Sequence, residues 1–378
     1  MTIFYITTTV HISKSLRESV GSTTHTYSIA NELQKCGHTV HVFSEKDSDD
    51  ASYENIHGIH VHRLKRAVVA PSSTIKKSRS RHFLKYLRFI PNTVLASQIA
   101  SLAKKEGCDV LFERGHSRGV AGLVSTMTNI PMVLETVDHI YSPLSLKKAK
   151  TVFSYTNAYF PEKHHHKYSY YADTIDPSLF HPVTTEKKYD VVYCGSFKEW
   201  DGLFDIVSAA QEIIQRNSRA QFLMVGDGRL KEEMEHFVTK KGLAKHFTFT
   251  GKVPLQEVKT YLSQARIGVA PFNTQNLNAP HFKKYGFHFP PLKIFEYMAC
   301  GLPVITIDAP QIKKRVTSDS GFFINEGDAH ALAQNILHLL EDTVLQEQMA
   351  DFNVKKANEH TWHDVALEIE SALKSAVI

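Results

Sequence analysis

The 378-residue sequence is poor in cysteine and contains no long apolar run. Its four cysteines lie far apart and form no CxxC pair, which argues against a disulfide framework and indicates thiols of a reducing compartment. The longest apolar runs are of the type VVYC or FLMV, far short of the roughly 20 residues that span a bilayer. The start, MTIFYITTTV, lacks a basic segment before a long apolar one, so we interpret it as a strand and not as a signal peptide. These absences favour a cytoplasmic protein.

The length and the patterning indicate two domains. A chain of 378 residues is too long for one ordinary core, and its alternation of strands and helices lapses into a polar segment around 172–189. We therefore expect a Rossmann-like domain over 1–172, a second one over 173–358, and a C-terminal helix over 359–378 that packs back on the first domain.

Short apolar strands alternate with helices in both halves, which is typical of parallel sheets with helices on both faces. In the first half, residues 57–63 alternate like an exposed strand, and Pro91 separates helical stretches at 81–90 and 93–106. Two such doubly wound sheets place ligands at the carboxyl ends of their strands. In the second half we expect strands at 190–196, 221–228, 246–251, 266–272, 302–308 and 321–324, and helices at 202–216, 229–241, 255–265, 292–300 and 328–341.

Positive charge is concentrated in the first half. Residues 1–172 carry 22 Lys and Arg against 13 Asp and Glu, and the remainder carries 22 against 26, which together give the net charge of +5. No acidic residue lies between Glu54 and Glu106, where 11 basic ones occur. Within this stretch, residues 76–90 combine basic side chains with an apolar helical face, which predicts an anionic membrane surface as a partner. The alternatives are a solvated basic face and packing of the apolar side chains on the first sheet.

The segment 290–306, PPLKIFEYMACGLPVIT, carries the clearest chemical signal. Its proline pair ends at Pro291, so the amides and the dipole of a helix that begins at Leu292 offer a site for a diphosphate. Lys293 lies in the first turn, where we expect a charge-assisted bond to phosphate. Glu296 lies one turn later and is suited to accept bonds from both hydroxyls of a ribose. The alternative is an i,i+3 ion pair between Lys293 and Glu296, but a positive charge in a first turn opposes the helix dipole, which favours a ligand.

Several segments together resemble one known family. The run PLKIFEYMACGLPVI resembles the donor-binding motif of the retaining glycosyltransferases of the GT-B fold, the group 1 family. FLMVGDGRLKEEME resembles the family's strand, Gly-Asp-Gly turn and helix, and FTFTGKVPLQEV its next strand and loop, where Val253 stands among the backbone groups that read the nucleobase. TIDPSLFHP is similar to the family's linker. The resemblance implies two Rossmann-like domains facing a central cleft, the first binding the acceptor and the second a UDP- or GDP-sugar donor.

Two departures from the family motif concern the donor sugar. The family presents an Arg and a Lys after the first strand of the second domain, whereas Ser196 and Asp201 occupy these positions in this sequence. Lys198 is the nearest substitute cation, unless it is an ordinary exposed loop lysine. His288 stands where the first of two family glutamates belongs, and Glu296 matches the second. Backbone amides just before the helix are expected to replace the missing carboxylate's contact with the sugar.

In the first domain, the family places a histidine near the sugar after the fourth strand. An ungapped match puts Arg114 at that position, with His116 two residues later. His116 is therefore the candidate that holds donor hydroxyls, although a histidine beside a glycine is often a plain loop residue. Arg114 faces the acceptor in this interpretation, but an ion pair with Glu113 or Glu135 explains it equally well.

Three further residues and one histidine run complete the candidates. Asp138 and His139 follow the next strand and are suited to orient an acceptor hydroxyl, or are loop residues without function. Gly21 permits close approach of the backbone to the donor, or simply forms a turn. The run at 164–166 does not predict a metal site, because three consecutive histidines do not readily converge on one ion.

The resemblance implies a mechanism without a metal or another cofactor. Lys198, Lys293 and the helix amides near residue 292 stabilise the negative charge that grows on the leaving diphosphate, and Glu296 holds the nucleoside. A lipid-linked or growing cell-surface glycan fits as the acceptor, and no nucleic acid is expected as a partner. Two other functions are compatible with the same fold: a nucleotide-sugar binding protein with a decayed site, and a nucleotide-sugar epimerase.

Overall fold

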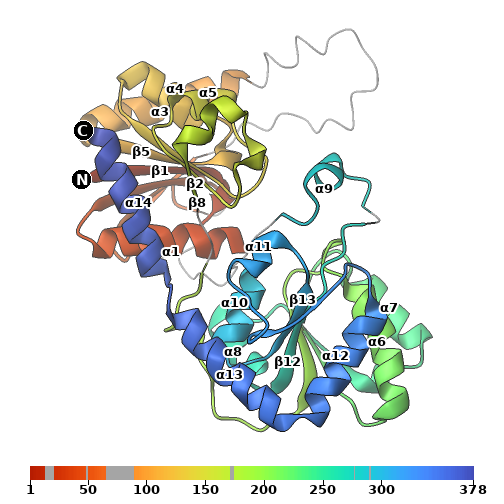
Figure 1. The fold of residues 1–378 in the computed structure, drawn as a ribbon. Coiled ribbons are helices and arrows are strands. Elements are labelled where there is room, and N and C mark those ends of the chain that lie inside the picture. The colour runs from red at the N-terminus through yellow and green to blue at the C-terminus, as the bar shows by residue number, and fades with distance from the viewer. Residues whose placement is uncertain (13–20, 48–49, 65–88, 171–173, 276, 289–290) are drawn as a thin grey trace. The chain divides into compact units, whose positions relative to one another are not determined.

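The computed structural model describes all residues except 13–20, 48–49, 65–88, 171–173, 276 and 289–290 (Figure 1). The chain divides into two compact units: unit 1 comprises Met1–Ala172 and Trp362–Ile378, and unit 2 comprises Asp173–Thr361. None of the helices in the described ranges is both long and apolar enough to cross a bilayer. Apart from residues 89 and 90, the basic stretch 76–90 lies outside the described residues.

Unit 1 is built on an eight-stranded sheet with the order β3-β4-β2-β1-β5-β6-β7-β8. Every neighbouring pair is parallel except β3 and β4. The central strands are buried on both faces, which explains their nearly continuous apolar sequences. The strands are β1 (Thr2–His11), β2 (Thr39–Glu45), β3 (Tyr53–Ile56), β4 (Ile59–Leu64), β5 (Val110–Arg114), β6 (Met132–Thr136), β7 (Val152–Ser154) and β8 (Tyr168–Tyr170).

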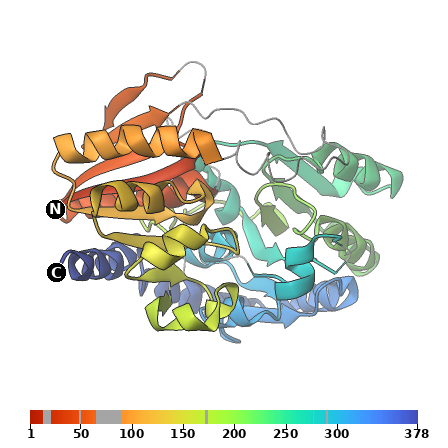
Figure 2. The same cartoon turned by 90° about the horizontal axis from the view of Figure 1, so that it is seen from above.

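Helices cover both faces of this sheet. The first and last helices of the chain pack together on one face, and the others on the opposite face (Figure 1). Figure 2 shows α3 and α14 on opposite sides of the sheet. The helices are α1 (Gly21–Lys35), α3 (Phe89–Lys105), α4 (Val120–Thr128), α5 (Pro143–Lys148) and α14 (Trp362–Val377), and short 3-10 turns occupy Gly115–Ser117, Asn157–Tyr159 and Glu162–Lys167.

The C-terminal helix packs on the first unit, as predicted. Trp362, Ile369 and Leu373 of α14 are buried in unit 1. A hydrogen bond of 2.7 Å joins Nε2 of His38 to Oε1 of Glu370 on the same helix. Apolar burial along one face and polar contacts at its edge therefore hold α14 against α1 and the sheet.

Unit 2 contains a six-stranded, fully parallel sheet with the order β11-β10-β9-β12-β13-β14. The strand order reverses between β9 and β12, and such a reversal opens a crevice at the carboxyl ends of the strands. The strands are β9 (Tyr189–Cys194), β10 (Phe222–Val225), β11 (Phe247–Gly251), β12 (Ala265–Ala270), β13 (Val304–Ile307) and β14 (Gly321–Ile324). The helices are α6 (Leu203–Arg216), α7 (Lys231–Lys240), α8 (Leu255–Ser263), α9 (Pro280–Tyr285), α10 (Leu292–Ala299), α11 (Pro310–Lys313), α12 (Ala329–Glu341) and α13 (Thr343–Asn358), with a 3-10 turn at Ala244–His246.

The structure corrects two local predictions. The strand expected at 57–63 is present as β4, but it is half-buried and is one arm of a hairpin: His57 and Gly58 adopt positive φ angles of 50° and 91° and form the turn between β3 and β4. Pro91 does not separate two helices, since α3 already begins at Phe89. A proline in the first helical turn costs no hydrogen bond because its missing N–H has no intrahelical partner.

Candidate active site

Helix α10 begins beside the reversal point of the unit 2 sheet. No side chain caps its first turn after Pro291. The hydroxyl of Tyr297 fixes the helix to the sheet: it accepts a 2.7 Å hydrogen bond from the amide of Cys194 in β9 and donates to the carbonyl of Val269 in β12 at 3.3 Å. A Cβ atom at Gly268 would lie 2.6 Å from the Tyr297 ring, so glycine is required there. The uncapped amides and the positive dipole end of α10 are therefore held at the place where the fold binds ligands.

Lys293, in the first turn of α10, lies in a closely packed polar site. Its Nζ atom donates to Oδ1 of Asp201 at 2.6 Å and to the hydroxyl of Tyr193 at 2.8 Å. The ammonium group also lies 4.3 Å from the ring centre of Tyr193 and 4.9 Å from that of Phe272. The ion-pair partner of Lys293 is therefore Asp201 and not Glu296, which was the alternative to a ligand role.

Glu296 is partly buried one turn further along α10. Burial raises the pKa of its carboxyl group to about 7, and the smaller opposing effect comes from the charge of Lys293. No residue of the described ranges gives its carboxylate a hydrogen bond. A carboxylate with unfilled acceptor positions is suited to bind a pair of ligand hydroxyls.

The loop that follows β9 brings the other donor-side candidates to α10. Gly195 has a φ of 156°, and a Cβ there would lie 2.9 Å from Nζ of Lys293. The carbonyl of Ser196 accepts a 3.2 Å hydrogen bond from Tyr193. Lys198 is exposed, and its ammonium lies 5.1 Å from the ring centre of Trp200.

Two further candidates of unit 2 lie in loops. Val253 follows β11 and packs, partly buried, against the core. His288 is 1% exposed, and the rings of His281, Phe282 and Tyr285 surround it at 5.5, 5.5 and 5.7 Å. The imidazole at the position of the family's first glutamate is therefore buried among aromatic rings.

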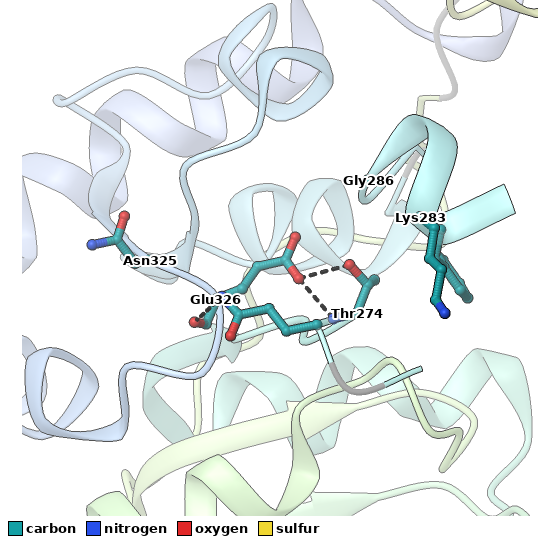
Figure 3. A pocket seen from close by; sticks show the side chains of 7 residues that line it. Thr274, Lys283, Gly286, Asn325 and Glu326 are labelled. Carbon is teal, nitrogen blue, oxygen red and sulfur yellow. Dashed lines mark hydrogen bonds between the residues drawn. The ribbon is translucent and has the colours of Figure 1, made fainter. Parts of the chain in front are cut away.

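A hollow of about 460 Å³ lies in the loops that follow β12 and β14 (Figure 3). The amide and the hydroxyl of Thr274 both donate to Oε2 of Glu326, at 2.7 Å each. Figure 3 shows Lys283 on α9, across from this pair. The lining combines amide, hydroxyl and carboxylate groups with the ring of Phe282, a composition that suits a polar ligand with apolar faces.

In unit 1, His116 and Asp138 form a pair at the carboxyl ends of β5 and β6. Nε2 of His116 lies 2.8 Å from Oδ2 of Asp138, and the other carboxylate oxygen accepts the amide of Ile140 at 2.7 Å. Burial raises the pKa of Asp138, but the hydrogen bond and the charge of His116 outweigh it and hold the pKa below its ordinary value. The imidazole remains about one third exposed, so it is oriented by a carboxylate and still accessible.

Arg114 belongs to a buried cluster in unit 1. Its Nη1 lies 3.5 Å from Oε1 of Glu135, which decides between the two ion pairs that the sequence left open. The same carboxylate pairs with His25 and accepts the Tyr5 hydroxyl at 2.9 Å. Burial raises the pKa of Glu135, but His25 and Arg114 outweigh it and lower the pKa to about 2. Arg114 is therefore held in a buried ion pair within unit 1, and its side chain is only 5% exposed.

The remaining unit 1 candidates lie at the ends of regular elements. Gly21 is the first residue of α1, and His139 follows β6 in a partly buried position. The run at 164–166 lies in a 3-10 turn. Within the described ranges, no three His, Cys, Asp or Glu side chains are arranged to hold a metal ion.

Comparison with known proteins agrees with this architecture. Residues 188–342 match the family model for glycosyl transferases group 1, and residues 20–168 match that for glycosyltransferase family 4. The structure of sucrose-phosphate synthase from Thermosynechococcus elongatus has a TM-score of 0.73 at 16% identity and covers 99% of both chains. That of Anabaena HepE in complex with UDP and glucose has a TM-score of 0.71 at 16% identity, covering 99% of this chain and 100% of that one.

The alignments with curated relatives cover only part of each protein. A GDP-mannose-dependent monoacylated alpha-(1-6)-phosphatidylinositol monomannoside mannosyltransferase of Corynebacterium glutamicum is 22% identical over 268 residues, 66% of each chain. The amylovoran biosynthesis glycosyltransferase AmsK of Erwinia amylovora is 29% identical over 142 residues, 37% of this chain and 33% of its own. The matches thus span two thirds or less of these relatives.

Two doubly wound units, with a helix N-terminus at the reversal point of the second, give the chain the GT-B fold. The chain belongs to the group 1 glycosyltransferases.

Proposed function

We propose that the protein is a retaining, metal-independent glycosyltransferase that moves a sugar from a UDP- or GDP-sugar to an acceptor hydroxyl. In this proposal unit 2 binds the donor and unit 1 the acceptor. The uncapped amides of α10 and the side chains of Lys293 and Lys198 hold the diphosphate, Glu296 holds the ribose, and backbone groups beside Val253 contact the base. His116, oriented by Asp138, holds hydroxyls of the donor sugar.

One observation supports the donor site above all. The start of α10, with uncapped amides, a lysine in its first turn and the Glu296 carboxylate one turn later, is fixed to β9 and β12 through Tyr297. Amides and a lysine suit a diphosphate, and a carboxylate suits the two hydroxyls of a ribose. A nucleoside diphosphate combines both groups, and Lys293 and Glu296 lie about one helical turn, near 5 Å, apart along α10.

The reaction would proceed with the leaving diphosphate on the face that the acceptor approaches. The bond between the anomeric carbon and the diphosphate oxygen breaks, and the acceptor oxygen forms the new bond on the same face. The acceptor proton passes to the departing diphosphate, so no protein base is required. The protein's contribution is electrostatic stabilisation of the negative charge that grows on this diphosphate.

The acceptor proposed from the sequence is a lipid-linked or growing cell-surface glycan, reached from the cytoplasm. The mannosyltransferase relative from Corynebacterium glutamicum is named for a phosphatidylinositol acceptor, and AmsK for the polysaccharide amylovoran. We also propose that the basic residues 76–90 bind an anionic membrane surface. Flotation with anionic and neutral liposomes tests this part: binding restricted to anionic vesicles supports it, and equal negligible binding to both contradicts it.

A thermal-shift screen across UDP- and GDP-sugars tests the donor class, because a ligand of the native state raises its stability by mass action. The stabilising sugar nucleotide is then incubated with candidate acceptors, with and without excess EDTA, and the product is analysed by NMR. We expect transfer in both conditions with the donor's anomeric configuration kept. Loss of turnover in EDTA that Mg²⁺ restores, or an inverted product, would contradict the mechanism. Conversion of the donor without an acceptor would instead indicate an epimerase.

A further inference from the structure

Asp201 forms an ion pair with Lys293, one of the two lysines of the proposed donor site. It is 3% exposed and follows β9 in the chain, whereas Lys293 comes from α10, 92 residues away. One carboxylate oxygen accepts the ammonium of Lys293 at 2.6 Å, and the other accepts the amide of Lys198 at 3.1 Å. A single buried carboxylate thus joins the loop after β9 to the first turn of α10 and contacts both lysines that the proposed function assigns to the diphosphate.

The lysine itself is fixed without losing its capacity for a ligand. A protonated lysine has three N–H donors, and two of them have partners in the described part of the chain, Asp201 and the Tyr193 hydroxyl. The rings of Tyr193 and Phe272 lie close to the same ammonium. The side chain of Lys293 is 12% exposed, so its third donor is left for a group that enters from solvent.

We propose that Asp201 is a counter-ion that sets the charge of the diphosphate site. It orients Lys293 toward the ligand, and it cancels most of the lysine's charge. The site therefore binds the diphosphate through one directed N–H and not through an unopposed cation. This inference rests on the proposed function. Its consequence concerns selectivity, because a free nucleoside diphosphate carries about one more negative charge than the sugar nucleotide. Cancelling the lysine's charge therefore lowers the affinity for the nucleoside diphosphate, which is the product, more than the affinity for the sugar nucleotide, which is the donor.

The direct test is Asp201→Asn, measured by isothermal titration with UDP, GDP, UDP-glucose and GDP-mannose. Whichever nucleotide the wild type binds, we expect this variant to bind the free nucleoside diphosphate about tenfold more tightly, from an added unit charge at short range. The gain for the intact sugar nucleotide is smaller, about fivefold, since the interaction scales with ligand charge. The matched control is Asp205→Asn, which removes the same charge four residues away, where the carboxylate contacts Asn273 and not Lys293.

A second comparison uses the double variant, in which neither partner of the pair is left as an unpaired buried charge. Lys293→Gln leaves the buried Asp201 carboxylate unopposed, so it should weaken nucleoside diphosphate binding by more than tenfold. Adding Asp201→Asn removes the opposing charge as well, and the double variant should regain at least half of this loss on a logarithmic scale. Urea unfolding of the single and double variants separates this recovery of binding from a recovery of stability, because binding is compared only between variants that are folded under the titration conditions.

Three results would overturn the inference while leaving the proposed function intact. They are unchanged or weaker nucleoside diphosphate binding by folded Asp201→Asn, an equal gain in Asp205→Asn, and a double variant no better than Lys293→Gln. Failure of the wild type to bind any of the four nucleotides would instead contradict the proposed function.

Discussion

Nε2 of His116 lies 2.8 Å from Oδ2 of Asp138, at the carboxyl ends of the neighbouring strands β5 and β6. Asp138→Asn should lower turnover about tenfold and His116→Ala about 100-fold, on the scale of the loss of a positioned polar catalytic group. Nucleoside diphosphate affinity should be unchanged, because a nucleoside diphosphate lacks the sugar hydroxyls that His116 is proposed to hold. Steady-state kinetics and titration check both expectations. Glu370→Gln, which alters the comparable His38–Glu370 pair, is the control and should retain turnover. Wild-type turnover in Asp138→Asn would exclude a positioning role.

Tyr297→Phe tests how α10 is held. The substitution leaves the amide of Cys194 buried without its 2.7 Å partner, which typically costs about 1–3 kcal/mol of stability. We expect a lower midpoint of urea unfolding and a weaker affinity for the nucleoside diphosphate. Tyr27→Phe removes a hydroxyl that bonds to His57 on the surface, and should change stability by less than about 0.5 kcal/mol. Equal effects of the two substitutions would contradict the role of Tyr297.

The fold was largely predictable, because in both halves of the sequence short apolar segments alternate with segments of helical periodicity. The hairpin at β3 and β4 was missed because its turn, His57 and Gly58, interrupts an otherwise regular alternation. Helix α13 was also missed, because residues 343–358 bury few apolar side chains and their sequence lacks a clear apolar face.

The candidate site was predictable only where its residues are close in sequence. Pro291, Lys293 and Glu296 share one helical segment, so spacing alone places them together. The Lys293–Asp201 pair joins residues 92 positions apart, and depends on the adjacency of β9 and β12, which no local pattern encodes. The choice of Glu135 over Glu113 as the partner of Arg114 likewise follows from the pairing of β5 with β6.

The histidines of unit 1 should make its stability depend on pH. His41 and His62 lie 3.0 Å apart between Nδ1 and Nε2, and burial, followed by the charges of neighbouring histidines, lowers the pKa of both to about 4 from 6.5. The folded state therefore favours the neutral rings, and this contribution is complete above pH 6.5 and is lost as the pH falls toward 4. Thermal unfolding between pH 7 and pH 4.5 should show the loss, and His62→Phe should reduce its slope. The same slope in the variant would contradict the assignment.

Nucleotide binding should release a proton near pH 6.5. Burial raises the pKa of Glu296 to about 7 in the free protein, and only the ionised carboxylate accepts bonds from both ribose hydroxyls. Affinity should therefore fall as the pH drops below 7. Calorimetric titration in buffers of different ionisation enthalpy measures the number of protons released on binding. In Glu296→Gln only the ligand's phosphate can release a proton, so this variant should release fewer protons than the wild type. Identical proton release by both proteins would argue against a bond from Glu296 to the ligand.

The central claim, that α10 of unit 2 binds the nucleoside diphosphate of the donor, is tested most directly by titrating UDP and GDP into wild type and Glu296→Ala. Each lost bond to the charged carboxylate should cost about 1.5–3 kcal/mol, which corresponds to an affinity at least tenfold weaker for the nucleoside diphosphate and for the intact sugar nucleotide alike. Glu341→Ala, which removes an exposed carboxylate at the end of α12, should bind as the wild type does. Unchanged nucleotide affinity in folded Glu296→Ala would contradict the account.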